Sequence, residues 1–132
     1  MTRVHARKGS TAVEVGITLP VFVLLLLGIV EWGWAFPRQV TLEHIARDAC
    51  RSGALTKEVA TATAAARSRA EQRLVEDGFV LDQVEILVST DTAPTAGRTM
   101  TVALAQPYQA LLGAVPTPID LRASATMRME DQ

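Results

Sequence analysis

The sequence predicts an α+β protein: a long N-terminal membrane-spanning helix that continues outside the membrane, a second helix, and a small three-stranded antiparallel sheet. Three observations predict this fold. An uncharged apolar run extends from Val15 to Val30, two later stretches repeat apolar residues with a helical period, and three C-terminal stretches alternate like strands. With 132 residues, the chain has room for one small domain beside a membrane segment.

The apolar run is long enough to cross a membrane. Of its residues, 12 are Val, Ile, Leu or Phe, and their insertion free energies sum to roughly −4 to −7 kcal/mol. Counting on to Phe36 brings the stretch to about the 20 residues that the hydrocarbon layer requires. We therefore expect a basic leader over residues 1–9, a transmembrane helix over 10–36 and an exported α+β domain over 37–132.

The two ends of this segment differ in charge and in aromatic content. Trp32 and Trp34 predict the far boundary, since indole rings favour the headgroup level, and Glu31 is expected to reach the same water layer. Basic residues before the apolar run predict a cytoplasmic N-terminus and an exported C-terminal domain. These residues are Arg3, Arg7 and Lys8.

A cleaved secretory signal is the alternative interpretation of the same run. Its cleavage site would follow the run as a pattern of small residues. The residues after Val30 read EWGWAF, in which two indoles and a carboxylate make a poor site. The pattern therefore favours a retained membrane helix.

Two helices are predicted outside the membrane. The first continues the membrane helix after an adjustment at Pro37, and Gly53 is its predicted stop. The second extends from about Lys57 to Asp77, with Thr56 as its cap and Gly78 as its stop. Their apolar stripes are Leu42, Ile45, Ala46, Ala49, Cys50 and Gly53, and then Val59, Ala62, Ala66, Ala70 and Leu74.

Three strands follow. Residues 84–89 and 99–104 alternate as strands, and the turn-rich stretch 91–97 predicts a hairpin loop between them. Pro107 halts the second strand, and residues 108–115 are expected to form a short loop or helical turn. Residues 119–130 alternate most regularly, which predicts a strand with one buried face. Asp82 and Glu85 are interpreted as exposed strand residues.

The remaining polar residues show no catalytic constellation. The sequence lacks a glycine-rich phosphate loop, an HExxH helix and a nucleophile elbow. Cys50 is interpreted as a small apolar helix residue, with an intermolecular disulfide as the alternative, and His44 as a solvated residue. The arginines of the second helix fit a solvated face better than a phosphate-binding patch. They are Arg67, Arg69 and Arg73.

The N-terminal block resembles a known processing site. Gly9 followed by STAVE and an apolar helix is similar to the site of type IV pilin-like proteins, and with Leu19-Pro20 and the leucine run it resembles the TadE-like family of tight-adherence (Flp-type) pilus systems. The stretches IARDACRSGAL at 45–55 and LRASATMRME at 121–130 also resemble that family.

The resemblance implies a function in assembly rather than catalysis. It implies cleavage between Gly9 and Ser10 by a prepilin peptidase, and a role for Glu14 in guiding assembly. The implied partners are that peptidase, other pilin-like subunits, the inner-membrane assembly platform and membrane lipid. The implied location is the bacterial inner membrane as a single-pass protein, with the C-terminal domain periplasmic or extracellular and with possible incorporation into a pilus.

Alternatives remain at two levels. Glu14 is either a snorkelling interfacial residue or the partner of the Ser10 amine that cleavage frees, one helical turn away. The chain is either a minor pilin or pseudopilin, or a membrane-anchored scaffold that never enters a fibre.

Cleavage reduces Lys plus Arg from 13 to 10 against 14 Asp plus Glu. The side chains of the cleaved protein then have a net charge of −4, so no nucleic-acid partner is expected. No metal or cofactor is expected either.

Overall fold

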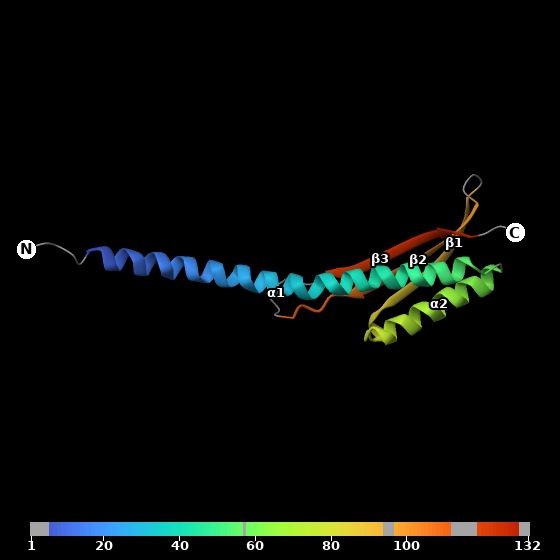
Figure 1. Ribbon diagram of the computed structural model, residues 1–132, viewed down its shortest axis with the longest axis horizontal. Coiled ribbons are helices and arrows are strands. Elements are labelled where there is room, and N and C mark those ends of the chain that lie inside the picture. The colour runs from blue at the N-terminus through green and yellow to red at the C-terminus, as the bar shows by residue number, and fades with distance from the viewer. Residues whose placement is uncertain (1–5, 57, 94–96, 112–118, 130–132) are drawn as a thin grey trace, which may run out of the picture.

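The computed structural model describes residues 6–56, 58–93, 97–111 and 119–129, with backbone only for 6–10 and 93. It confirms the predicted α+β fold (Figure 1). Two helices are followed by a short 3-10 turn and then by a three-stranded sheet. The elements are α1 (Ala6–Ala54), α2 (Val59–Glu76), η1 (Leu81–Gln83), β1 (Glu85–Ala93), β2 (Gly97–Pro107) and β3 (Asp120–Arg128).

Helix α1 dominates the shape of the molecule. It has 49 residues, which corresponds to a length of about 74 Å. Pro20 and Pro37 both lie inside it, so the predicted continuation beyond Pro37 is confirmed and proceeds as one helix. Its N-terminal half projects away from the other elements, whereas its C-terminal half lies against α2 and the sheet (Figure 1).

The C-terminal half of α1 supplies the centre of the core. The predicted stripe is confirmed, because all six of its residues are buried. Most of these side chains are small, so α2 and the sheet can approach the helix closely. The larger apolar volume comes from elsewhere in the core, above all from Leu74, Met100, Val102 and Leu104.

Helix α2 returns antiparallel to α1 and buries its alanine stripe (Figure 1). The predicted cap was wrong: α2 is capped by the extended backbone of Glu58 without a side-chain hydrogen bond, while the Thr56 hydroxyl donates to the Ser52 carbonyl at 3.5 Å. The predicted stop at Gly78 is confirmed. Gly78 has φ of +78°, and its N–H and that of Phe79 donate to the carbonyls of Val75 and Leu74.

The sheet has the order β1-β2-β3 with antiparallel pairing throughout. The first two strands are longer than predicted, since Asp91 to Ala93 belong to β1 and Gly97 begins β2, so the hairpin connection falls at 94–96, outside the described residues. The third strand lies where it was predicted. Residues 108–111 form no helix, and the rest of the predicted 108–115 loop or turn lies outside the described residues.

The two helices cover one face of the sheet. Helix α1 contacts β3 and β2, and α2 contacts β1. The alternation in β2 and β3 places buried residues on the helical side, whereas Arg122, Ser124 and Thr126 are exposed on the other face. Glu85 is an exposed strand residue as predicted, but Asp82 is not in a strand: it lies in η1.

Gly53 has a different role from the predicted helix stop. It is the penultimate residue of α1, it is buried, and it is not among the described glycines with positive φ. A Cβ at this position would overlap the Met100 sulfur and lie 2.9 Å from both the Ala62 carbonyl oxygen and the Ala66 Cβ. Gly53 therefore permits the close crossing of α1, α2 and β2.

Replacement of Gly53 by alanine is expected to destabilise the domain formed by α2, the sheet and the C-terminal half of α1. Overpacking costs about 1–3 kcal/mol and exceeds the gain in helix propensity, which is about 1 kcal/mol. Thermal unfolding in detergent, followed by near-ultraviolet circular dichroism, should show a midpoint lower by about 5–10 °C. Gly33→Ala is the matched control, because a Cβ there meets nothing within 4 Å. An unchanged midpoint in Gly53→Ala would contradict the packing role.

Candidate functional site

The N-terminal half of α1 has an apolar surface that the protein itself does not cover. Among the described residues, one helix is long and apolar enough to cross a membrane, and the apolar window of that helix is not buried. Side chains such as Ile17, Leu24 and Ile29 are 60–67% exposed. This arrangement is compatible with a single-pass membrane anchor.

The predicted processing and assembly residues lie at the start of this surface. The backbones of Arg7, Lys8, Gly9 and Ser10 are helical and belong to α1, while their side chains lie outside the described part. Glu14 is exposed on the same helix, so positions 10 and 14 share one helix face, as predicted from their spacing. The Thr18 hydroxyl donates to the backbone carbonyl of Glu14 at 2.8 Å.

The aromatic boundary lies at the other end of the apolar surface. Trp32 is 72% exposed and Trp34 is 44% exposed. The guanidinium of Arg38 lies 5.1 Å from the centroid of the Trp34 ring, one helical turn further along. An exposed indole with a cation just beyond it is typical of the interfacial region of a membrane protein.

Glu31 does not reach the water layer, so that expectation was wrong. Its side chain is only 3% exposed, and it accepts hydrogen bonds from the Tyr108 hydroxyl at 2.6 Å and from the Leu111 backbone N–H at 2.8 Å. These two donors come from the chain that follows β2, almost 80 residues away in sequence. We call the contacts among Glu31, Tyr108 and Leu111 the carboxylate clasp. The clasp joins the apolar span directly to the C-terminal domain.

Tyr108 is suited to remain a donor in this contact. Burial raises the pKa of its phenol above the ordinary value of 10.0, and the neighbouring Glu31 carboxylate raises it further. The side chain is 7% exposed and belongs to the core. The sequence contained one signal for the clasp, a carboxylate close to the end of an apolar span, which requires a polar partner. It gave no indication that Tyr108 was that partner.

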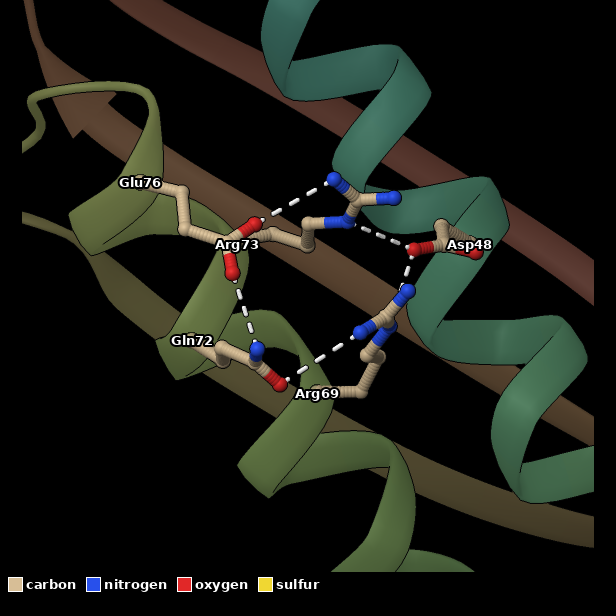
Figure 2. Close-up of polar contacts among 5 residues, drawn as sticks. All are labelled: Asp48, Arg69, Gln72, Arg73 and Glu76. Carbon is tan, nitrogen blue, oxygen red and sulfur yellow. Dashed lines mark hydrogen bonds and ion pairs between the residues drawn. The ribbon is translucent and has the colours of Figure 1, made fainter.

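A second polar cluster joins the two helices outside the apolar span (Figure 2). One carboxylate oxygen of Asp48 in α1 accepts from Arg69 Nε at 3.0 Å and from Arg73 Nε at 2.9 Å, both in α2. On α2, Gln72 and Glu76 hold the two guanidinium groups in place. We call this the Asp48 cluster. Two of the three arginines that were predicted to lie on a solvated face, Arg69 and Arg73, therefore bind a carboxylate of the other helix.

The charges of this cluster stabilise the ionised carboxylate. The hydrogen bond from Arg73 lowers the pKa of Asp48 below 3.8 most strongly, the charge of Arg69 adds to the effect, and partial burial opposes it. Asp48 likewise raises the pKa of Arg73. A signal for this contact existed in the sequence, because Asp48, Arg69 and Arg73 each adjoin a buried stripe residue.

The remaining candidate residues have structural positions. Cys50 is fully buried, as predicted, and its thiol donates to the Met100 carbonyl at 3.2 Å. Burial raises the pKa of this thiol above 9.0. His44 is exposed, as predicted. Within the described ranges, no group of three or more His, Cys, Asp or Glu side chains could hold a metal ion.

Comparison with known proteins identifies the N-terminal third of the chain. Residues 9–51 match the family model described as TadE-like protein. This segment is similar to TadE-like proteins. The match begins at Gly9 and contains Glu14, the apolar span, both tryptophans and Asp48. It agrees with the resemblance found in the sequence and associates the chain with Tad pili, whose TadE-like components are structural proteins.

The match also has limits. It ends at Arg51, so α2 and the sheet lie outside it, as do the clasp residues Tyr108 and Leu111. No curated protein and no solved structure matches the chain. The segment that matches the TadE-like model therefore carries the functional assignment, and the C-terminal domain is understood from its own contacts.

The Asp48 cluster generates a prediction about stability and pH. Its side chains are 33–41% exposed, so each ion pair is worth at most about 1 kcal/mol. Asp48→Asn should therefore lower the free energy of unfolding at pH 7 by roughly 1 kcal/mol. The folded-state pKa lies below the unfolded value, so this stabilisation is complete above about pH 4 and decreases as the pH falls through the folded pKa.

Denaturant unfolding of wild type and Asp48→Asn between pH 7 and pH 2 measures both the loss of stability at pH 7 and its dependence on pH. The difference between the two proteins should close at the acidic end. Glu43→Gln is the control, because Glu43 forms an exposed pair with Arg47 on the same helix, worth about 0.3–0.5 kcal/mol. Equal stability of wild type and Asp48→Asn at pH 7, or a difference that does not narrow as the pH falls below about 4, would contradict the role of the cluster.

Proposed function

We propose that this chain is a minor pilin or pseudopilin of a tight-adherence pilus. In this proposal a prepilin peptidase cuts between Gly9 and Ser10, α1 holds the subunit in the bacterial inner membrane, and the subunit helps to start or stabilise a fibre. The N-terminus is cytoplasmic and the domain after residue 36 is exported. The chain acts without a catalytic site of its own, through contacts with pilin-like subunits and the assembly platform.

One observation carries the proposal: the apolar half of α1 is continuous with the half that organises the exported domain. An apolar helix about 30 Å long that stands free of its own domain can pass from lipid to a bundle of similar helices without unfolding. A domain joined to its anchor by a flexible linker would not be held in a fixed position relative to that bundle. The TadE-like match over residues 9–51 supports the same assignment.

Glu14 has a defined role in the proposal. Cleavage after Gly9 would leave a charged amine on Ser10, one helical turn before the exposed carboxylate of Glu14. In a bundle of helices, the carboxylate of one subunit can pair with the amine of its own or of a neighbouring subunit. Loss of the carboxylate leaves a buried ammonium unpaired, at a cost on the order of 3 kcal/mol.

Glu14→Ala should therefore be inserted and processed normally but fail in assembly. A cost of this size corresponds to about a hundredfold loss in the assembly equilibrium. Fibres counted by electron microscopy, at equal levels of membrane-bound protein, provide the measurement. Val13→Ala is the matched control, because Val13 is its exposed apolar neighbour, and it should assemble normally. Normal fibre numbers with Glu14→Ala would instead favour a membrane-anchored scaffold that never enters a fibre.

A further inference from the structure

The depth of the carboxylate clasp follows from the geometry of α1. Counted from Val15, the first residue of the uncharged run, the roughly 20 residues that span a hydrocarbon layer end at Trp34. Glu31 is three residues short of that end, which places it about 5 Å inside the layer at 1.5 Å per residue. A carboxylate at such a depth needs hydrogen-bond donors from protein, because bulk water is absent.

Those donors come from the exported domain. Since the Leu111 N–H and the Tyr108 hydroxyl lie 2.8 Å and 2.6 Å from the Glu31 carboxylate, the backbone at Leu111 lies at nearly the same depth as Glu31. Figure 1 shows the same relation, with the orange segment that follows β2 extending further along α1 towards the N-terminus than the described parts of the sheet and α2. The domain thus has a part that overlaps the end of the membrane span.

The side chains at this level suit a lipid surface. Leu111 is 52% exposed and Ile119, where the described chain resumes, is 47% exposed. Between Ile119 and Trp32 lies a small cavity of about 110 Å³ with an almost entirely apolar wall. Arg38, which is exposed about 6 Å beyond Trp34, stands at the level of the phosphates.

We propose that the exported domain makes a second contact with the membrane, in which Leu111 and Ile119 enter the outer edge of the hydrocarbon layer beside Trp32. The partner is the lipid surface itself, and the contact is continuous with the apolar span. Glu31 and Tyr108 are the positioning residues, because the hydrogen bonds to the Glu31 carboxylate hold Tyr108 and Leu111 against α1. This inference rests on the membrane anchoring of the proposed function. It adds that the domain sits on the bilayer in a fixed orientation.

The second contact has a physical consequence for assembly. A subunit held by the span alone can tilt and rotate about the point where α1 leaves the membrane. Insertion of Leu111 and Ile119 at the boundary between headgroups and acyl chains restricts that rotation and presents one side of the domain to neighbouring subunits. Extraction into a fibre then requires both side chains to leave the lipid together with α1.

Site-directed spin labelling of the full chain in vesicles of phosphatidylcholine and phosphatidylglycerol tests the proposal. Cys50→Ser removes the native thiol and keeps a donor for the Met100 carbonyl, and the label is then attached to Leu111→Cys. Collision rates with oxygen, which partitions into lipid, and with a water-soluble nickel chelate report the depth. Leu87→Cys is the matched control, since Leu87 is 58% exposed but lies on β1. Leu24→Cys reports the middle of the span.

The label at Leu111→Cys should show an oxygen-to-nickel ratio severalfold above that at Leu87→Cys and below that at Leu24→Cys. Adding Tyr108→Phe, which removes one donor to Glu31, should shift the label at Leu111→Cys towards water and leave the other two unchanged. A ratio at Leu111→Cys equal to that at Leu87→Cys would overturn the proposal, as would protection from both reagents, which indicates a protein contact. An unshifted label in Tyr108→Phe would overturn the role of the clasp. Water exposure at Leu24→Cys would instead show that the anchoring itself is wrong.

Discussion

The structure depends on the continuity of α1, because one helix serves two different environments. Its C-terminal half is the element on which α2, β2 and β3 pack, whereas the apolar window of its N-terminal half is not buried by the described chain. Pro20 and Pro37 lie inside the helix without ending it. Any force or constraint that acts on the apolar half is therefore transmitted to the C-terminal domain, whose core is built on the same helix.

Three contacts fix the domain to this helix at three positions along its length. Near the end of α1, the missing side chain of Gly53 lets α2 and β2 approach closely. Further back, the two guanidinium groups that bind Asp48 set the position of α2 along α1. At the end of the apolar span, Glu31 holds the chain that follows β2. The first contact is steric, the second is electrostatic in partial solvent, and the third is a buried hydrogen-bonded carboxylate.

Much of this fold was predictable from local patterns. The stripes of α1 and α2 and the alternation of β3 are periodic over many residues, and the structure confirms them. Local errors concerned the cap at Thr56 and the strand assignment of Asp82. Two other errors were at positions where a distant partner decides the role of a residue. Gly53 looked like a helix stop because the sequence could not show that Met100 and Ala62 lie against it. Glu31 looked like an interfacial residue because its donor, Tyr108, is nearly 80 positions away. For the candidate site, the TadE-like match agrees with the resemblance that the residues from Gly9 to the leucine run predicted, while processing at Gly9 and the role of Glu14 remain predictions.

We propose that an assembly machine handles this helix after its leader has been removed. The most direct test is the intact mass of the membrane-bound protein purified from a host that carries a prepilin peptidase. The account predicts a chain that begins at Ser10, and it predicts that Gly9→Val, whose side chain blocks a tight cleft, keeps the leader. A wild-type chain that still carries its first nine residues in such a host would contradict the account.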